Sequence, residues 1–451
     1  MFGLSINNIA EICRGEILGV IPTEVIEPVS ISIDSRNVTP GVIFAAFRGE
    51  NADGNAYIGK AFENGAAACI TDRIPDRNVS GPIILVKDVK KALVAIASAF
   101  RNTLSIPFVG ITGSVGKTTA KEMVYSVLSQ RYNVLKTEKN FNNQLGVPMT
   151  ISNIQKEHEI AVIEMGISKI NDMDLLGDIV RPYVGVFTSI GKAHLEYLKD
   201  LAGVFSEKTK MLKYMDEDAL VVVNSDDTWL DSIHFKGEVK RCSVRKTADY
   251  SAEHIRFTPD GRTVFDIVCE DRIKDVVIHS FGMHYVSDAL LAAAVGKRFG
   301  LSGDEIREGI ASFKNIGRRG DIIRKNGFLI IDDSYNANPE SVRSAIDSMM
   351  LLPGRHICIL GDMLELGQDE AALHFETGRY ALEKGIDAVY TFGTLSRNIS
   401  DAAHKSGAKH YDEFDDLISD VSKDIRENDI ILIKASRGMH FERISEALKN
   451  L

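Results

Sequence analysis

The sequence lacks any long run of hydrophobic residues. Its longest apolar stretch, Ala289 to Gly296, is far shorter than the roughly 20 residues that a membrane-spanning helix needs. The first residues, Met1 to Arg14, have neither the basic start nor the long apolar segment that mark an export signal. We therefore expect a protein that is neither inserted in a membrane nor exported.

Cysteine is scarce and shows no pairing pattern. The five cysteines are odd in number, stand far apart and form no Cys-x-x-Cys motif: Cys13, Cys69, Cys242, Cys269 and Cys358. This pattern is typical of reduced thiols, so we expect a cytoplasmic protein.

An excess of positive charge is also absent. Lys and Arg number 53 against 63 Asp and Glu, which makes the net charge −10, and the isoelectric point is near 5.6. The chain therefore lacks the broad basic surface that nucleic acids require, although local patches can still bind phosphates. Hydrophobic residues make up 44% of the chain and charged residues 26%, which is ordinary for a globular protein and excludes disordered and low-complexity classes.

With 451 residues, the chain is long enough for about three domains of roughly 150 residues each. Short apolar runs alternate with amphipathic stretches, which predicts an α/β architecture. In the first segment we expect strands at Val42–Phe47 and Ile83–Val86 and a helix at Lys90–Arg101. A new strand is predicted at Phe108–Thr112, so we place a boundary near residue 102.

The second segment is predicted to span residues 103–317 and the third residues 318–451. Within the second we expect the strands Ile160–Met165, Val184–Ser189 and Ala219–Asn224, a β-rich insertion around Val239–His279 and a long helix at Ser287–Gly300. The stretch Ile316–Gly320 resembles a linker. After it, strands and helices alternate again, which predicts a small doubly wound domain. Its expected strands are Phe328–Asp332, His356–Leu360, Ala388–Phe392 and Ile430–Lys434.

The strongest chemical signal is Gly110-Ile-Thr-Gly-Ser-Val-Gly-Lys-Thr-Thr119, which links a predicted strand to a helical pattern from Ala120. Glycines let backbone N–H groups surround phosphate oxygens, and a helix N-terminus favours anions. Lys117 would neutralise the β- and γ-phosphates, and the hydroxyl of Thr118 would bind Mg²⁺. The stricter loop pattern has glycine in place of Ile111. A plain strand–turn–helix is the alternative, but the Lys and Thr in their places disfavour it.

Three further groups follow along the chain. Glu164 ends a predicted strand, where ligands gather in open α/β sheets, so it is a suitable Mg²⁺ ligand, but an ordinary acid facing water is an equal alternative. His194 follows the next strand and a glycine turn, and a lone histidine is more often a surface or internally satisfied group. Glu207–Lys210 lies in an amphipathic pattern, for which a solvated charged helix face is the simpler explanation.

Taken together, these segments resemble the Mur ligase family of peptidoglycan synthesis. The phosphate loop of that family reads T-G-[ST]-x-G-K-T, which Thr112–Thr118 matches and which accounts for Ile111. Other segments similar to family motifs are Asp34-Ser-Arg36, Pro40-Gly41, Gly49 with Asp53-Gly54, Asn140 to Pro148, Glu164-Met-Gly166, Ala193-His-Leu-Glu196 and Glu207-Lys208. The resemblance covers essentially the whole chain.

Strings in the last segment narrow the resemblance to the member that adds D-alanyl-D-alanine to UDP-N-acetylmuramoyl-tripeptide. They are Asp332-Asp-Ser-Tyr-Asn-Ala-Asn-Pro339, Gly361-Asp-Met-Leu-Glu-Leu-Gly367 and Lys434-Ala-Ser-Arg-Gly-Met439. The resemblance implies an N-terminal α/β domain for the uridine nucleotide, a central phosphate-loop domain with a parallel sheet and a Rossmann-like C-terminal domain. It also implies a monomer that uses ATP and Mg²⁺ to make an acyl phosphate, which the dipeptide amine then attacks.

The resemblance further implies roles for individual residues. ATP would contact Thr112, Gly113, Ser114, Val115, Gly116, Lys117, Thr118, Thr119, Asp288, Arg318 at the triphosphate and Asp333 at the ribose. The substrates would contact Asp34, Ser35, Arg36 and Arg48 at the uridine diphosphate, and Asn142, Asn143, Tyr335, Asn336, Asn338, Lys434, Ser436 and Arg437 elsewhere. Catalysis would depend on Lys117, Glu164, His194 and Lys208, and two Mg²⁺ ions on Thr118, Glu164, His194 and Lys208.

Lys208 poses a chemical problem, because a lysine ammonium has three donors and no acceptor and so cannot bind Mg²⁺. In the family this lysine reacts with CO₂ to give a carbamate, which is negatively charged. That reaction needs the neutral amine, so we expect nearby cations such as Mg²⁺ or Lys210 to depress the lysine pKa. The simpler alternative is that Lys208 pairs with Glu207 or Glu196 on a solvated helix face.

Several positions depart from the family pattern, namely Asn55, Lys139, Tyr285, Asp288 and Ala435. Tyr285 and Asp288 replace two asparagines, one of which contacts the adenine region in relatives.

Two other functions stay open: a different amide ligase such as a folylpolyglutamate synthase, which lacks the N-terminal domain, and a nucleotide switch without ligase chemistry. For the third residue of the acceptor peptide, both diaminopimelate and lysine fit the sequence.

Overall fold

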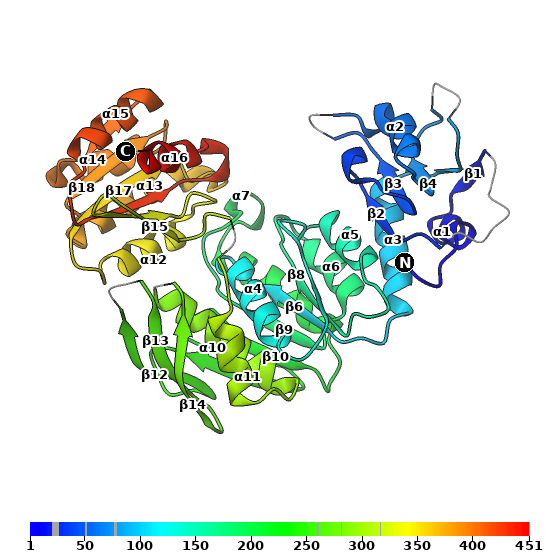
Figure 1. Cartoon of the computed structure of the whole chain (residues 1–451), viewed down its shortest axis with the longest axis horizontal. Coiled ribbons are helices and arrows are strands. Elements are labelled where there is room, and N and C mark those ends of the chain that lie inside the picture. Colours follow the sequence, from blue (N-terminus) through cyan, green and yellow to red (C-terminus); the bar gives the residue numbers. More distant parts are fainter. Residues whose placement is uncertain are drawn as a thin grey trace.

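The structure is a computed structural model that describes residues 1–19, 27–49, 52–75, 79–258, 261–280, 282–315 and 317–450. Three α/β units follow one another along the chain, and each has its own sheet. In Figure 1 the central unit (cyan to yellow-green) lies at the bottom, and the first (blue) and third (yellow to red) units lie above it on opposite sides. The predicted α/β class is confirmed. Ile316, in the predicted linker, lies outside the described residues.

The first unit has a five-stranded sheet in the order β1-β5-β4-β3-β2, in which only β1 runs antiparallel to its neighbour. The predicted strands are present as β3 and β5, and the short strands β1, β2 and β4 were not predicted. The strands are β1 Glu16–Leu18, β2 Ser30–Ser32, β3 Val42–Ala46, β4 Ala68–Thr71 and β5 Ile83–Leu85, and the α-helices are α1 Ile6–Cys13, α2 Ile58–Glu63 and α3 Val89–Asn102.

The central unit has a nine-stranded sheet in the order β14-β13-β12-β11-β10-β9-β6-β8-β7. All neighbours from β7 to β12 are parallel, and β12, β13 and β14 are antiparallel. Its strands are β6 Phe108–Thr112, β7 Val134–Lys136, β8 Ile160–Glu164, β9 Val184–Phe187, β10 Leu220–Asn224, β11 Glu238–Ser243, β12 Tyr250–Phe257, β13 Thr263–Val268 and β14 Arg272–Ile278. The β-rich segment that we expected as an insertion is therefore an extension of this sheet, because β11 pairs with the edge of β10.

Helices cover both faces of the central sheet: α4 Lys117–Leu128, α5 Gly146–Ser152, α6 Asp172–Val180, α7 Leu195–Leu198, α8 Leu201–Thr209, α9 Thr228–Asp231, α10 Met283–Arg298 and α11 Gly303–Ala311. The longest apolar stretch of the sequence lies in α10, whose residues 289–295 are buried between α4 and strands β10–β12. This explains why the stretch 289–296 of α10 is apolar on every side. Among the described residues, no helix is both long and apolar enough to cross a membrane.

The third unit has a six-stranded sheet in the order β15-β16-β20-β17-β18-β19, with only β15 antiparallel. Its elements are β15 Asp321–Lys325, β16 Phe328–Asp332, α12 Pro339–Met349, β17 Arg355–Gly361, α13 Glu370–Glu383, β18 Ala388–Phe392, α14 Arg397–Ala402, β19 Lys409–Tyr411, α15 Phe414–Asp424, β20 Asp429–Lys434 and α16 Glu442–Lys449. The four predicted strands are all present, as β16, β17, β18 and β20, and β15 and β19 had not been predicted.

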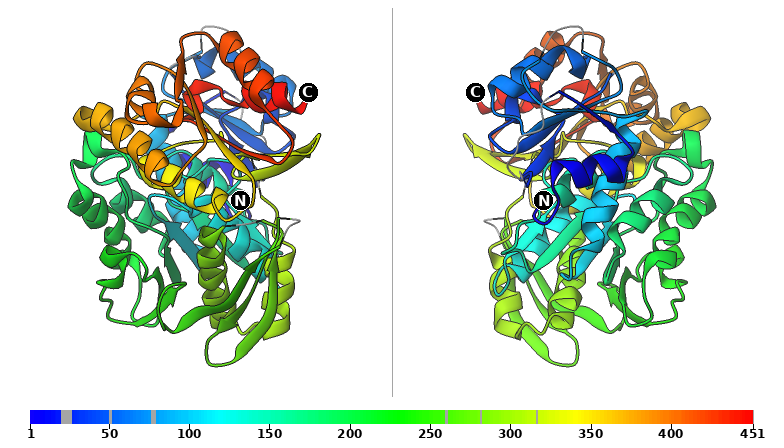
Figure 2. Two further views of the ribbon diagram at one scale, coloured as in Figure 1. Left: turned by 90° about the vertical axis from the view of Figure 1, so that its left-hand side faces the viewer. Right: turned by 90° about the vertical axis from the view of Figure 1, so that its right-hand side faces the viewer.

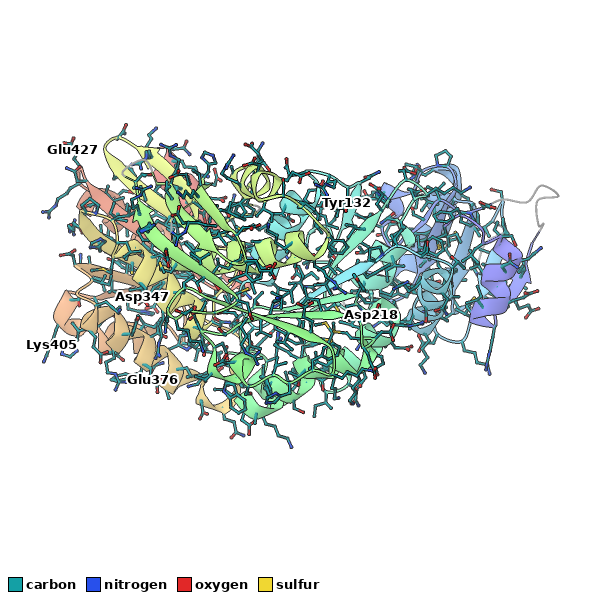
Figure 3. The ribbon with its side chains drawn as sticks, turned by 90° about the horizontal axis from the view of Figure 1, so that it is seen from below. Tyr132, Asp218, Asp347, Glu376, Lys405 and Glu427 are labelled. Atoms are coloured by element: carbon teal, nitrogen blue, oxygen red, sulfur yellow. The ribbon has the colours of Figure 1, made fainter. Side chains whose placement is uncertain are left out.

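The two ends of the central unit are joined to their neighbours in different ways. One hydrophobic core continues from the first unit into the central one, whereas the third unit has two cores of its own. The side views show the first and third units above the central one (Figure 2). Seen from below, charged side chains such as Asp347 and Glu376 extend outward from the third unit (Figure 3). All five cysteines, which lie in the described part of the chain, are free thiols.

Candidate active site between the central and third units

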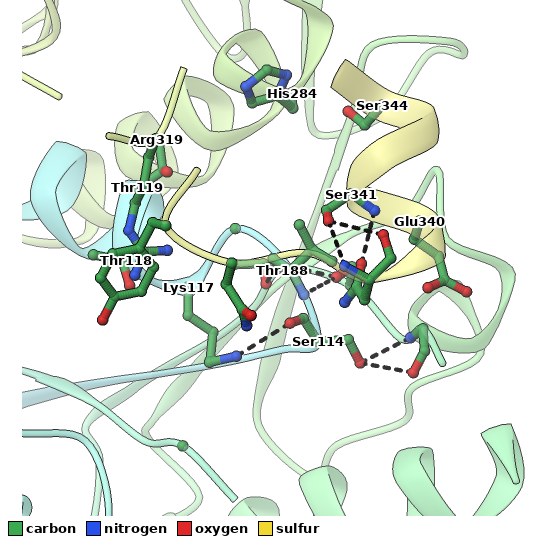
Figure 4. Close-up of a pocket in the computed structure, with 18 of the residues that line it drawn as sticks. Ser114, Lys117, Thr118, Thr119, Thr188, His284, Arg319, Glu340, Ser341 and Ser344 are labelled. Atoms are coloured by element: carbon green, nitrogen blue, oxygen red, sulfur yellow. Dashed lines mark hydrogen bonds between the residues drawn. The ribbon is translucent and has the colours of Figure 1, made fainter. Parts of the chain in front are cut away.

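The carboxyl ends of the central strands meet at one cavity of about 640 Å³. Strands β8, β6, β9 and β10 are neighbours in the sheet, so the residues that follow them converge at one edge. The third unit closes the opposite side with residues after β16, the start of α12 and the loops after β17 and β20. Figure 4 shows Lys117, Thr188, Ser341 and Arg319 around this space.

The phosphate loop connects β6 to α4 and is held from below by the segment after β9. Gly113 and Gly116 both have positive φ, and a Cβ at Gly113 would overlap the hydroxyl of Thr188. The N–H of Ser114 donates to the carbonyl of Ser189 (2.8 Å), and the Ser114 hydroxyl donates to the carbonyl of Gly191 (3.1 Å). The loop is therefore preformed, and α4 begins at Lys117 with its N-terminus facing the cavity.

Glu164 and Thr118 lie together at the floor of the cavity. The Thr118 hydroxyl donates to Glu164 Oε2 (3.0 Å), and Asn142 Nδ2 donates to Glu164 Oε1 (2.8 Å). Glu164 is 2% exposed, so it is not the water-facing acid of the alternative interpretation. A hydroxyl and a carboxylate beside a phosphate loop form the kind of incomplete oxygen set that Mg²⁺ completes with phosphate oxygens and water.

Two lysine ammonium groups converge on a single carbonyl of the loop. Lys117 Nζ donates to the carbonyl of Gly113 at 2.7 Å, and Lys208 Nζ donates to the same oxygen at 2.9 Å. Lys208, on α8, is 2% exposed, so the solvated helix face that we considered as its alternative is wrong. Burial, followed by the charge of Lys117, lowers the pKa of Lys208 well below its usual range. We had expected Lys210 to be a nearby cation, but Lys210 pairs with Asp174 (2.7 Å) and Glu207 (2.8 Å).

His194 lies at the N-terminus of α7 and reaches across to the third unit. Its Nδ1 is 2.9 Å from Oε2 of Glu365, and both residues line the cavity. Hydrogen bonding to His194 lowers the pKa of Glu365. Both residues also have positive φ, 55° for His194 and 63° for Glu365.

On the third unit, two predicted site residues bind each other. Lys434 Nζ donates to Asp333 Oδ2 (2.6 Å) and to the carbonyl of Asn336 (2.8 Å), and all three residues line the cavity. Ser436 is buried under the site, where its hydroxyl accepts from the N–H of Leu364 (2.9 Å). Ser436 therefore holds a loop in place and does not itself line the cavity.

The two arginines that follow Gly317 point in different directions. Arg318, which we expected at the triphosphate, has its guanidinium 2.9 Å from Glu446 and does not line the cavity. Arg319 lines it instead, with its guanidinium 3.9 Å from the centre of the Tyr335 ring. Arg437 approaches the same ring at 5.4 Å, so an aromatic face holds two cations at the cavity wall.

The start of α10 forms the remaining wall with His284, Tyr285 and Asp288. Burial lowers the pKa of His284 to about 4 and raises that of Asp288 well above its usual range. Tyr285 donates its hydroxyl to the carbonyl of Arg319 (2.7 Å), which fixes the segment leading to the third unit. Tyr285 and Asp288, two of the residues that depart from the family pattern, therefore both line the cavity wall.

The residues predicted for the uridine diphosphate lie elsewhere, on the first unit. Arg36 is exposed and forms a bidentate ion pair with Asp34, in which Nε is 2.9 Å from Oδ1 and Nη2 is 2.7 Å from Oδ2. Ser35, between them in the sequence, is buried. Arg48 is exposed and pairs through its backbone with Asp53. None of these residues lines the described cavity.

The structure thus gathers most of the predicted residues around the cavity: Ser114, Val115, Gly116, Lys117, Thr118, Thr119, Asn142, Asn143, Glu164, His194, Asp288, Asp333, Tyr335, Asn336, Asn338, Lys434 and Arg437. Thr112, Gly113, Lys208 and Ser436 lie directly behind that wall. Four residues for which the sequence predicted no role also line the cavity: Arg319, Glu365, His284 and Glu340. Glu365 stood within the string Gly361–Gly367 and Arg319 within the predicted linker, so both were in segments already singled out.

Family comparisons match nearly the whole chain. Residues 111–296 match the sequence model described as the Mur ligase middle domain, and residues 318–437 match the Mur ligase glutamate ligase domain. Residues 29–101 match the Mur ligase family catalytic domain.

Individual relatives are similar over their full length. The UDP-N-acetylmuramoyl-tripeptide–D-alanyl-D-alanine ligase of Bacillus subtilis is 33% identical, with 99% of each chain covered. Among solved structures, MurF from Acinetobacter baumannii has a TM-score of 0.89 at 26% identity, with 99% of each chain covered. MurF ligase from Thermotoga maritima, solved in complex with ADP, has a TM-score of 0.83 at 29% identity, covering 93% of this chain and 97% of that one.

Proposed function

This chain belongs to the Mur ligase family, and from that we propose that it is an ATP-dependent ligase that joins D-alanyl-D-alanine to UDP-N-acetylmuramoyl-tripeptide. The observation that carries the proposal is the full-length similarity to ligases of that name, together with a preformed phosphate loop that faces a polar cavity. The product is the UDP-linked pentapeptide of peptidoglycan precursor synthesis. We expect this reaction to take place in the cytoplasm, and we expect the enzyme to act as a monomer.

ATP is the nucleotide expected at the phosphate loop, since a similar ligase was solved with ADP. Lys117 and the N-terminus of α4 supply positive charge where the β- and γ-phosphates would lie. Arg319, which lies beside Thr118 and Thr119, and Arg437 of the third unit add two cations to the cavity wall. Since Arg319 lines the cavity and Arg318 pairs with Glu446, we assign the triphosphate contact to Arg319 in this arrangement.

The chemistry needs two steps. A carboxylate oxygen of the tripeptide attacks the γ-phosphorus, the bond to the β-phosphate oxygen breaks, and ADP leaves. The amine of D-alanyl-D-alanine then attacks the carbonyl carbon of the acyl phosphate, inorganic phosphate leaves, and the amine loses a proton. Since carboxylate and phosphate repel each other, the work of the protein is positioning and charge neutralisation, which the lysines and arginines of the cavity provide.

Mg²⁺ fits the donor groups that the cavity presents. Thr118 and Glu164 would hold one ion, and that ion would neutralise the phosphate oxygens. In the described part of the chain, no three His, Cys, Asp or Glu side chains gather at one point, so a metal here must take ligands from phosphate, water or a modified residue. His194, whose ring nitrogen now pairs with Glu365, is the candidate for a second ion.

Lys208 supports the expectation of a carbamate. Its buried amine shares one carbonyl oxygen with Lys117, and burial favours the neutral form that reacts with CO₂. The amine nitrogen bonds to the carbon of CO₂ and loses a proton, which leaves a carbamate anion. That anion would place a negative charge next to the ammonium of Lys117.

Phosphate release from ATP tests the reaction. We expect release only when UDP-N-acetylmuramoyl-tripeptide and D-alanyl-D-alanine are both present. Release that needs neither substrate would indicate a nucleotide switch or another hydrolase. Folylpolyglutamate formation with a folate substrate and glutamate, without pentapeptide formation, would favour the rival ligase.

The carbamate has its own test. Incubation with ¹³C-labelled bicarbonate should give a carbamate carbon signal in NMR that is absent from the Lys208→Ala variant. That variant should lose most of its activity, and a short added carboxylic acid should restore part of it. A fully active Lys208→Ala enzyme would show that Lys208 has no part in the reaction.

A further inference from the structure

Another buried lysine lies one helical turn beyond Lys117, outside the wall of the cavity. Lys121, on α4, is 1% exposed, and its ammonium group has three partners. It donates to the carbonyl of Thr137 (2.6 Å), lies 2.8 Å from Glu122 Oε1 and lies 4.0 Å from Glu164 Oε2. The two close contacts and the charge of Glu164 at 4.0 Å hold Lys121 between α4, the end of β7 and the end of β8.

The partner Thr137 is the first residue after β7 and begins the segment 137–146, which we call the asparagine loop. Residues 138–140 of this loop are exposed, so the loop depends on contacts at its two ends. At its start, the Thr137 hydroxyl accepts from the N–H of Glu164 (3.0 Å). Farther along, the carbonyl of Asn142 accepts from the N–H of Gly166 (2.7 Å) and its side chain donates to Glu164.

The spacing on α4 explains how one helix serves both loops. Residues four apart lie on the same face of a helix, so Lys117 and Lys121 point to the same side. Lys117 reaches the phosphate loop at Gly113, and Lys121 reaches the asparagine loop at Thr137. The distance between the two loops is therefore set by one turn of helix.

We propose that Lys121 is a positioning residue that fixes the asparagine loop, and through Asn142 the carboxylate of Glu164, relative to the phosphate loop. The expected effect of Lys121 on catalysis rests on the proposed function. Its expected effect on the position of the asparagine loop does not. Glu122 completes the arrangement, because its carboxylate neutralises both Lys121 and Lys136, the latter at 2.5 Å. The cluster of two lysines with Glu122 and Glu164 is thus electrically balanced, which suits its burial.

Hydrogen exchange, followed by mass spectrometry on the full chain, tests the structural part without any turnover. In Lys121→Met we expect the amides of residues 137–146 to exchange at least tenfold faster, while peptides from the third unit stay unchanged. Lys121→Gln keeps a donor for the Thr137 carbonyl and should show a smaller increase, and it serves in place of the Met variant if that variant does not fold. Unchanged exchange in 137–146, or a uniform increase across the chain, would overturn the proposal.

Lys136→Met is the matched control. It also removes a lysine that pairs with Glu122, but Lys136 lies over the ring of Tyr125 and has no hydrogen bond to Thr137 or Glu164 among the described contacts. We expect exchange in 137–146 to change less than twofold in this variant. An increase equal to that of Lys121→Met would show that any loss of charge near Glu122 loosens the loop, and the special role of Lys121 would be wrong.

A double-mutant cycle tests the catalytic part. If Lys121 acts through the asparagine loop, the effects of removing Lys121 and of removing Asn142 on kcat/KM should not be additive in free energy. We expect kcat/KM for dipeptide-dependent phosphate release in Lys121→Met plus Asn142→Ala to lie within twofold of the worse single variant. Effects that multiply would refute the coupling. If the wild type shows no dipeptide-dependent release, the ligase proposal fails while the exchange result still decides the role of Lys121.

Discussion

The two junctions of the central unit differ in chemistry. At the junction with the first unit, α3 packs on α5 and α6, and Phe100, Val147 and Ile151 belong to one buried apolar cluster. At the junction with the third unit, polar pairs such as His194–Glu365 border the cavity, and Phe257 of the central unit packs against an apolar core of the third unit.

The two junctions therefore suit different tasks. One holds two units together, and the other encloses the cavity. Apolar contact removed from water stabilises a junction without specific partners, so it suits two units that stay together. Phosphates and carboxylates need charged or polar partners, so the junction that encloses the cavity suits the proposed binding of such groups.

The largest effect is expected at the polar junction, from Lys117→Ala. Loss of the charge that faces the phosphates should lower kcat by about 10³-fold. The thermal midpoint should change little, because Lys117 is only partly buried and contacts a loop carbonyl. Steady-state phosphate release and a melting curve measure the two quantities. A large loss of thermal stability would point to a structural lysine.

The apolar junction should give the opposite result in Phe100→Ala. Phe100 is fully buried, with the ring of Phe2 at 5.4 Å, so its truncation should lower the free energy of unfolding by about 3–5 kcal/mol. Denaturant unfolding measures this loss, and kcat of the folded protein should stay near the wild-type value. Phe375→Ala is the control, since Phe375 is 48% exposed and should cost less than about 0.5 kcal/mol. Equal losses in both variants would contradict a continuous core.

The variant Arg36→Ala tests whether the first unit, besides sharing a core with the central unit, also contacts the UDP-peptide substrate. If the exposed Arg36 contacts the uridine diphosphate, the KM for the UDP-peptide should rise about tenfold, which corresponds to about 1.4 kcal/mol. The KM for ATP should be nearly unchanged. Lys60→Ala removes another exposed cation of the same unit and should alter neither constant. Equal effects of Arg36→Ala on both substrates would place this segment outside the substrate site.

The smallest effect is expected from Glu365→Gln, which weakens the pair with His194 at the polar junction. The Glu365 side chain is 61% exposed, so the change should lower the free energy of unfolding by less than about 1 kcal/mol. Denaturant unfolding beside Phe100→Ala provides the comparison. A loss as large as that of Phe100→Ala would mean that both junctions hold the units with equal strength.

Much of the fold could be predicted because its strands are long and apolar. Phe108–Thr112, Phe328–Asp332 and Ala388–Phe392 have the predicted bounds. Short edge strands such as β1 and β19 were missed because Glu16 and Lys409 leave them without an apolar run, whereas β5, also three residues long, is apolar throughout. The domain bounds at 102 and 317 stay predictions, and the apolar core that crosses the first of them had no signal in the sequence.

The sequence by itself determined the α/β class, the phosphate loop, the position of Glu164 at the end of a strand and the family. These are local properties, since a strand, a glycine turn and a helix start need only neighbouring residues. The tertiary structure alone decided that Arg319 and not Arg318 lines the cavity, that Lys208 is buried against Gly113, and that His194 meets Glu365. Each of these depends on segments far apart in the chain, whose contacts are set by how the units pack and not by the residues on either side.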